Sequence, residues 1–278
     1  MQVEARGLTF DMTTGGPEGG MPVLLLHGFP QDRREFDLMT PKLHAAGLRT
    51  YAYDQRGYSP GARPDGVDAY KLSESTADAV AVLDALGIES AHVIGHDWGA
   101  QVAWLLAANH AARVRTLTAV SVPHPRALGL ALRTRPSQRM RFAYMGVFRA
   151  SFAERLLLAG NARVLRQMMS QIKDRAPQYA DAMTADPGRL TGGLNWYRAL
   201  SGDQLAGAGI IGVPTTYVWS DRDGVVGRTA ALRTTDWIEA DYQLVVMRGI
   251  SHWVPEQAAG ALADVAIARM KGVSQTSN

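Results

Sequence analysis

Three residues in this sequence have the types that covalent hydrolysis needs, and each follows a short apolar run. Asp97 stands in "GHDWG" after "AHVI", Asp223 in "SDRDG" after "TTYVW", and His252 in "GISHW" after "QLVVM". A carboxylate is ionised at neutral pH and can attack carbon directly, whereas a histidine can activate water. This chain order, nucleophile then acid then histidine, is expected when the nucleophile stands on a sharp turn between a strand and a helix. We therefore predict that Asp97 is the nucleophile, His252 the base and Asp223 the group that orients the base.

Each carboxylate has an alternative interpretation. Asp221, two residues before Asp223, could orient His252 instead, or could simply form a turn. Asp97 could serve only as the cap of the helix that follows it. A cap, however, does not account for the glycines on either side or for the acid and histidine in the expected order.

An aspartate nucleophile restricts the reaction. Attack on a carbonyl carbon would give an unstable anhydride, whereas attack on a saturated carbon gives an alkyl ester that water can hydrolyse. The charge that develops on the ester oxygen during hydrolysis needs backbone N–H donors. The expected donors are Trp98, directly after the nucleophile, and Phe29 in "LLLHGFPQ". His27, in the same segment, is interpreted as a hydrogen-bonded structural residue.

The group that leaves the saturated carbon could be a halide or an epoxide oxygen. A halide needs N–H donors around it, whereas the more basic epoxide oxygen needs a proton, which a tyrosine hydroxyl can supply. Tyr144 in "RFAYMGVFR" and Tyr197 in "GGLNWYRAL" are candidates, and Tyr179 in "APQYAD" is a third.

Composition places the chain among ordinary globular proteins. It has 278 residues, of which 46% are hydrophobic and 20% charged, and it contains no cysteine. We expect a cytoplasmic protein, because neither a membrane span nor a signal peptide is recognisable. The net charge is +3, and the arginines between Arg126 and Arg175 are interpreted as a solvated helix face, so we expect no nucleic acid and no membrane as partner.

The order of the elements predicts the architecture. Apolar runs and amphipathic stretches alternate between residues 20 and 122 and again after residue 207, which is typical of a mostly parallel sheet flanked by helices. Residues 124–206 lack strand patterns and predict an all-helical insertion over the carboxyl ends of the strands, here termed the lid. The predicted core comprises residues 1–123 and 207–278.

These segments together resemble the epoxide hydrolases of the α/β-hydrolase fold. The resemblance is carried, in the family's order, by "HGFP", "YDQRGYS", "GHDWGA", "LNWYRA", "WSDRDGVVG" and "SHWVPEQ". It implies the same roles for Asp97, His252 and Asp223, and it implies Tyr144 and Tyr197 as the pair that polarises the epoxide oxygen. It also implies a cis peptide bond before Pro30. The Met, Leu and Phe residues throughout the predicted lid suggest a small hydrophobic epoxide as substrate, and we expect no cofactor and no metal.

The sequence departs from the family around Tyr144. Arg149 stands where the family usually has a glutamine, and Phe142 and Ala143 replace its common Ser-Trp pair. The oligomeric state stays open, a homo-oligomer included.

Three other functions remain as alternatives. Haloalkane dehalogenases share the fold and the Asp-Trp pair, but many place an asparagine where this chain has Phe29. Haloacetate dehalogenases need an arginine after the nucleophile, where this chain has Trp98. The third alternative is a binding protein of the hydrolase fold that has lost catalysis. Such proteins normally lack part of the triad of nucleophile, acid and histidine, whereas this chain retains Asp97, Asp223 and His252.

Overall fold

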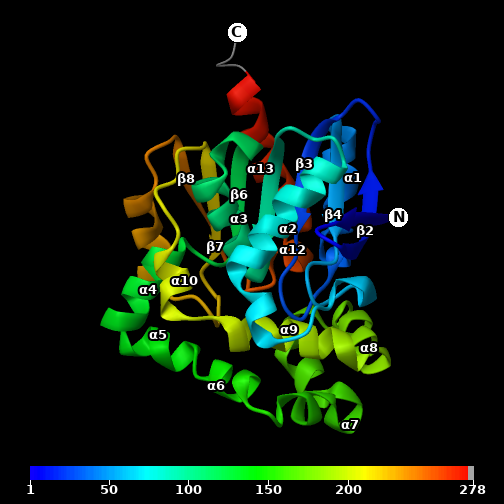
Figure 1. Ribbon diagram of the computed structural model, residues 1–278. Coiled ribbons are helices and arrows are strands. Elements are labelled where there is room, and N and C mark those ends of the chain that lie inside the picture. Colours follow the sequence, from blue (N-terminus) through cyan, green and yellow to red (C-terminus); the bar gives the residue numbers. More distant parts are fainter. Residues whose placement is uncertain (275–278) are drawn as a thin grey trace.

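Eight strands form one sheet in the order β1-β2-β4-β3-β5-β6-β7-β8 (Figure 1). This computed structural model describes residues 1–274. The six strands β3 to β8 are parallel to one another, and β2 runs antiparallel to both β1 and β4. Their bounds are β1 (Gln2–Ala5), β2 (Leu8–Gly15), β3 (Met21–Leu26), β4 (Leu48–Tyr53), β5 (Ala91–His96), β6 (Val114–Val120), β7 (Thr215–Ser220) and β8 (Tyr242–Met247).

The central strands are apolar on both faces because helices cover both faces of the sheet. In β3, Val23 and Leu25 join the apolar cluster on one face, and Leu24 and Leu26 join the cluster on the other. Successive side chains of a strand point to opposite faces, so a strand covered on both sides becomes a continuous apolar run. This explains the run "PVLLL" that precedes the predicted oxyanion segment.

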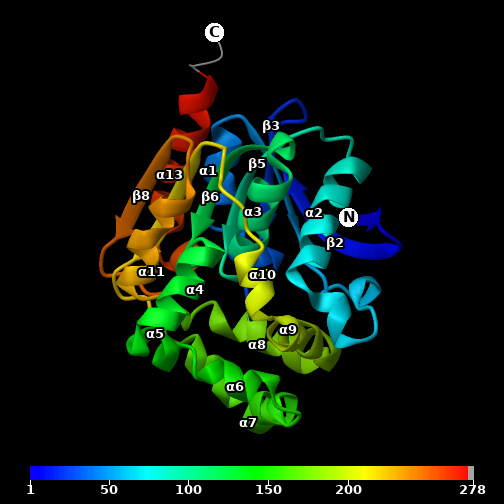
Figure 2. The same ribbon diagram turned by 60° about the vertical axis from the view of Figure 1, so that its left-hand side comes forward.

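The core helices form a layer on each side of the sheet (Figures 1 and 2). Helices α1 (Thr40–Ala45) and α13 (Ala259–Ser274) pack together on one face, and α2 (Leu72–Ala85) and α3 (Trp98–Asn109) pack together on the other. Two short helices, α11 (Arg228–Leu232) and α12 (Val254–Gln257), follow β7 and β8. Among the described residues, none of the helices is both long and apolar enough to cross a membrane.

Seven helices separate β6 from β7 and lie together beyond one end of the sheet (Figure 2). They are α4 (Pro125–Thr134), α5 (Pro136–Arg141), α6 (Tyr144–Arg149), α7 (Ala153–Met168), α8 (Ala176–Ala185), α9 (Pro187–Ala199) and α10 (Gly202–Ala206). Helix α7 is kinked, because residues 159–162 leave helical backbone angles. These helices fall within the range predicted for the lid.

Candidate active site

Asp97 stands on the turn between β5 and α3, in a backbone conformation that non-glycine residues rarely adopt. Its φ is 50° and its ψ is −116°. The turn is tight enough to require small neighbours, since a Cβ on Gly95 would lie 2.3 Å from the carbonyl oxygen of Gly99, and one on Gly99 would lie 1.9 Å from that of Leu26. The glycines on either side of Asp97 therefore allow the backbone to hold its carboxylate beyond the end of the sheet.

The carboxylate of Asp97 contacts both a backbone donor and the predicted base. The Phe29 N–H donates to Oδ1 at 3.0 Å, and Nε2 of His252 lies 3.3 Å from Oδ2. Burial raises the pKa of Asp97, but the hydrogen bond and charge of His252 outweigh burial and hold the pKa below its ordinary value. Asp97 is therefore ionised at neutral pH.

The two predicted oxyanion donors differ in their contacts. The Phe29 N–H already faces Asp97, and the peptide bond between Phe29 and Pro30 is cis, which confirms that expectation. The Trp98 N–H makes no hydrogen bond to Asp97 within the described part of the chain. As the first N–H of α3, it has no partner inside its own helix.

Asp223, and not Asp221, accompanies the histidine. Nδ1 of His252 lies 2.9 Å from Oδ2 of Asp223, whose Oδ1 accepts hydrogen bonds from two backbone N–H groups of the following turn. Asp221 is exposed and accepts a hydrogen bond from the Gly249 N–H. Burial lowers the pKa of His252, but the charges and hydrogen bonds of Asp223 and Asp97 outweigh burial and raise the pKa to about 10.

Tyr144 begins α6, and Tyr197 lies near the end of α9, so the lid supplies both tyrosines. Their ring centroids are 6.2 Å apart, and the ring of Tyr197 packs edge-on against Phe29 and Trp98. Burial raises the pKa of both hydroxyls far above the ordinary tyrosine value, so each remains a protonated donor. Tyr179, on α8, does not line the cavity at Asp97.

Two cavities open on either side of the tyrosine pair, and both are lined by Asp97, Tyr144, Tyr197 and Val225. The small lobe has a volume of about 40 Å³ and is also lined by Trp98, Gln101, Leu128, Phe142, Met145 and Leu200. The large lobe has a volume of about 420 Å³, and its further lining includes Phe29, Phe148, Leu156, Met168, His252 and Trp253. Both are mainly apolar, and the Asp97 carboxylate and the two tyrosines are among the lining residues that they share.

Sequence reasoning missed a buried chain of polar groups behind the triad. The Gly28 N–H donates to Oε2 of Glu35 at 3.3 Å, and the same oxygen lies 3.3 Å from Nδ1 of His96. Nε2 of His96 donates to the carbonyl oxygen of His252 at 3.0 Å. Burial raises the pKa of Glu35 and lowers that of His96, which favours the neutral form of both side chains; in that form the Glu35 hydroxyl can donate to Nδ1. The chain connects the segment that carries the oxyanion donor to the segment that carries the base.

His27 has the structural environment that the sequence analysis expected. Its ring is fully buried; Nδ1 donates to the carbonyl oxygen of Gly28, and Nε2 accepts from the Gln55 N–H. With both nitrogens occupied, the ring fixes the backbone beside Asp97 and takes no part in the cavity.

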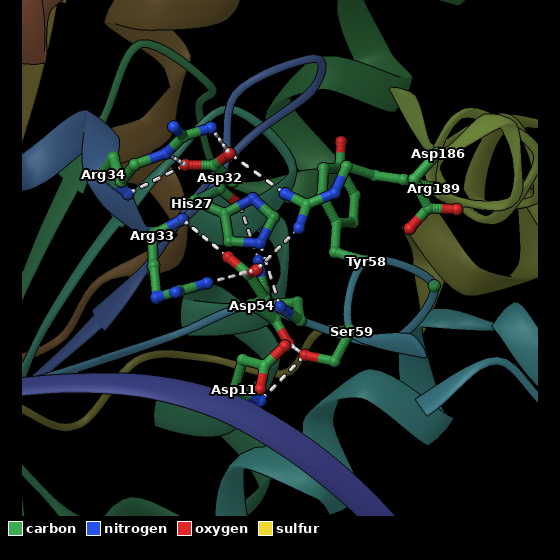
Figure 3. Close-up of polar contacts among 12 residues, drawn as sticks. Asp11, His27, Asp32, Arg33, Arg34, Asp54, Tyr58, Ser59, Asp186 and Arg189 are labelled. Carbon is green, nitrogen blue, oxygen red and sulfur yellow. Dashed lines mark hydrogen bonds and ion pairs between the residues drawn. The ribbon is translucent and has the colours of Figure 1, made fainter. Parts of the chain in front are cut away.

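Ion pairs attach one part of the lid to the core (Figure 3). Arg189 of α9 donates to Asp32 at 3.0 Å and to Asp54 at 3.2 Å, and both of these carboxylates are buried. Arg34 pairs with Asp32 and Arg33 pairs with Asp54 from the core side. Because each carboxylate faces arginines from two elements, α9 is held at a fixed position over the strand ends.

Arg149, the departure from the family pattern, connects the two helices that carry the tyrosines. From the last turn of α6 its guanidinium donates to the carbonyl oxygens of Tyr197 and Leu200, at 2.8 and 2.7 Å. These carbonyls end α9 and need donors from outside the helix. Arg149 thus fixes the spacing of Tyr144 and Tyr197. Among the described residues, no three His, Asp or Glu side chains are grouped so that they could hold a metal ion.

The fold and this site together define the class of protein. The chain belongs to the α/β-hydrolase fold family, whose sequence profile matches residues 21–259.

Individual relatives are more specific. Epoxide hydrolase A of Mycobacterium tuberculosis is 31% identical, and the similarity covers 93% of this chain and 92% of that protein. The AB hydrolase superfamily protein YfhM of Bacillus subtilis is also 31% identical, with 91% of each chain covered. The crystal structure of epoxide hydrolase A from Mycobacterium thermoresistibile superposes with a TM-score of 0.85 at 28% identity, over 98% of both chains. These similarities confirm the predicted fold, the resemblance to epoxide hydrolases and the prediction of a hydrolase.

Proposed function

We propose that the protein converts a hydrophobic epoxide and water into a vicinal diol through a covalent ester on Asp97. The observation that carries this proposal is the placement of the ionised Asp97 and the two tyrosines, Tyr144 and Tyr197, around the same cavity. The similarity to proteins named epoxide hydrolases supports the same assignment.

In the first step, a carboxylate oxygen of Asp97 attacks one oxirane carbon and the carbon–oxygen bond of the ring breaks. The electron pair of that bond moves to the ring oxygen, which takes a proton from one of the two tyrosines. The product is a hydroxyalkyl ester of Asp97. A buried tyrosinate is strongly disfavoured, because burial raises the pKa of both hydroxyls, so the tyrosine is then reprotonated.

Formation of the ester on Asp97 also lowers the pKa of His252, so that the ring can act as a base. Before the reaction, Asp97 and Asp223 together raise the pKa of His252 to about 10, so the ring is an imidazolium at neutral pH. The ester has no charge, so one of the two carboxylates that stabilise the imidazolium is lost and the pKa of His252 falls. The proton that His252 releases balances the proton that the tyrosine gave to the product.

In the second step, neutral His252 takes a proton from water while the water oxygen attacks Cγ of Asp97. The Phe29 N–H, which lies 3.0 Å from Oδ1, is placed to stabilise the charge that develops on this oxygen. Collapse of the tetrahedral intermediate breaks the bond from Cγ to the alkoxide oxygen. The alkoxide takes the second proton of the former water from the hydroxyl group on Cγ, so the diol is released and the water oxygen remains in the carboxylate. His252 is again an imidazolium beside ionised Asp97, as at the start.

The test is to assay diol and free halide side by side on a panel of alkyl and aryl epoxides and alkyl halides. Diol without halide is expected, and halide without diol would replace the proposal with a dehalogenase. If the protein forms neither diol nor halide, the result would favour a binding protein.

Two further measurements test the ester on Asp97. His252→Gln should accumulate a covalent adduct that intact-protein mass spectrometry detects, whereas Asp97→Asn should form none. A single turnover of the unaltered protein in water labelled with heavy oxygen should place the label in the Asp97 peptide. Label in the diol alone would contradict the ester.

A further inference from the structure

Gln101 is a buried polar residue at the cavity that the proposed reaction leaves unused. It lies one helical turn after Asp97 on α3, its backbone N–H donating to the Asp97 carbonyl oxygen. Its side chain is 5% exposed and lines the small lobe, where the other side chains with polar groups are Asp97, Tyr144, Tyr197 and Trp98. Gln101 is the one amide side chain among the described residues that line this lobe.

The nitrogen of the Gln101 amide has a hydrogen-bond partner, whereas its oxygen has none among the described residues. Nε2 donates to the carbonyl oxygen of Pro123 at 3.5 Å, whereas Oε1 has no hydrogen-bond partner within the described part of the chain. An unpaired buried acceptor costs free energy comparable to a lost hydrogen bond, so buried oxygens are normally satisfied. Since Nε2 is directed toward Pro123, Oε1 is the atom of the amide that remains unpaired, and it can only accept.

The size of the lobe limits what that molecule can present. A volume of about 40 Å³ accommodates only two or three atoms heavier than hydrogen. Gln101 follows Asp97 by one helical turn, which corresponds to about 6 Å along the helix axis. A substituent that enters this lobe from the oxirane must therefore be short. The large lobe, about ten times the volume, takes the remainder of the substrate.

We infer that the substrate is an epoxide with a short substituent ending in a hydrogen-bond donor, such as a hydroxymethyl group, on one oxirane carbon and a larger apolar group on the other. The inference rests on the proposed epoxide hydrolysis and adds to it. Gln101 accepts the donor in the small lobe, and the hydrocarbon lies in the large lobe. Because this fixes which end of the oxirane lies in which lobe, it also fixes the orientation of the ring over Asp97.

The test compares two oxiranes that differ in one atom. Both carry a hexyl group on one ring carbon; the other ring carbon carries hydroxymethyl in the first and the isosteric ethyl group in the second. Wild-type protein should hydrolyse the hydroxymethyl compound with a kcat/KM about tenfold higher, as one hydrogen bond to a buried acceptor allows. Gln101→Met, which keeps the volume but removes the acceptor, should bring this ratio close to one.

A matched control is Met145→Leu, which changes packing in the same lobe without changing its hydrogen bonds. It should keep the wild-type ratio, whatever its absolute rate. Equal kcat/KM for the two oxiranes in the wild type, with diol formed from both, would overturn the Gln101 inference and leave the proposed function standing. A wild-type ratio that Gln101→Met does not lower would overturn it equally.

A binding measurement separates this inference from the proposed function. If neither oxirane yields diol, the proposed function fails, and the affinities of hexanol and hexyl methyl ether then decide about Gln101. Quenching of tryptophan fluorescence reports the binding, since Trp98 lines the lobe. Tighter binding of the alcohol, lost in Gln101→Met, supports a donor site at Oε1. Equal binding, or preference for the ether, which can only accept, overturns it.

Discussion

At the level of single residues, the charges of Asp97, Asp223 and His252 determine one another. Asp97 is held ionised by the imidazolium of His252, and that imidazolium is held by two carboxylates. In the proposed reaction, formation of the ester would remove one charge of this set and thereby change His252 from the imidazolium into the neutral base. The proposed attack and hydrolysis would thus need opposite protonation states of His252, and ester formation would itself produce the change.

The hydroxyl groups of Tyr144 and Tyr197 can be removed one at a time, which tests their proposed role as proton donors. Tyr144→Phe and Tyr197→Phe should each slow ring opening by about a hundredfold, because each removes one proton donor at the epoxide oxygen. Tyr179→Phe, on a buried tyrosine outside the cavity, is the control and should leave the step unchanged. Single-turnover formation of the ester, followed by rapid-quench mass spectrometry, measures the step. Unaltered ester formation in both cavity variants would make the pair a packing contact.

The residues that the sequence revealed are those with a local signature. Asp97, Asp223 and His252 each follow a strand at a turn, and the structure places the ring of His252 between the two carboxylates, 2.9 Å from Asp223 and 3.3 Å from Asp97. Glu35 and Gln101 carry no such signature. Their significance comes from burial and from which atoms remain unpaired, and neither property can be seen before the chain is folded.

At the scale of the element, the segments that follow strands must keep their relative positions. The neutral chain from Gly28 through Glu35 and His96 to the carbonyl of His252 joins the segment after β3 to the segment after β8. Both segments contact Asp97, one through the Phe29 N–H and the other through His252. The Glu35 side chain therefore acts as a positioning group, not as a charge.

Two substitutions of Glu35 separate these roles. Both contacts of Glu35 are made by Oε2, so Glu35→Gln can keep only one of them: its oxygen can accept from the Gly28 N–H, or its nitrogen can donate to His96. This variant should therefore lose less stability and less kcat than a variant that loses both contacts. Glu35→Leu leaves two buried groups unpaired and should lower the free energy of unfolding by about 2–5 kcal/mol, with a reduced kcat. Chemical denaturation and steady-state assays measure both effects. Equal damage in the two variants would indicate that the carboxyl group itself is needed.

The elements themselves were largely predictable. Apolar runs predicted the parallel strands, because strands covered on both faces cannot be polar on either. The absence of such runs between residues 124 and 206 predicted helices, which the structure contains there. The kink in α7 and the division into seven helices were not predictable, since they depend on packing against the core. The attachment of α9 through Arg189 was missed as well, because ion pairs between distant segments leave no local pattern.

At the scale of the whole molecule, stability should depend on pH through a carboxyl group of α12. Burial raises the pKa of Glu256 to about 7, and Nε2 of Gln31 donates to its Oε1 at 2.8 Å. A carboxyl group whose pKa is raised on folding stabilises the fold when protonated. That contribution is complete below the unfolded pKa and is lost as the pH rises through about 7.

Glu256→Gln should remove this dependence. The amide stays neutral and keeps the acceptor for Gln31, so the variant should be more stable than wild type above pH 7, by up to about 3 kcal/mol. Below pH 5 the two proteins should unfold at similar denaturant concentrations. Denaturation curves across this pH range measure the free energy of unfolding of both proteins. The prediction would be refuted if, between pH 5 and pH 9, the wild-type protein does not lose stability relative to the variant.

The assignment of groups to core and lid has a consequence for how such a protein can change. The groups that would hydrolyse the ester, namely His252, Asp223 and the Phe29 N–H, all belong to segments at the strand ends, whereas both hydroxyls that would assist the leaving oxygen belong to α6 and α9. On the proposed mechanism, substitutions in the lid could therefore suit another leaving group without altering the groups that hydrolyse the ester. The two proposed half-reactions would then evolve on separate parts of one chain.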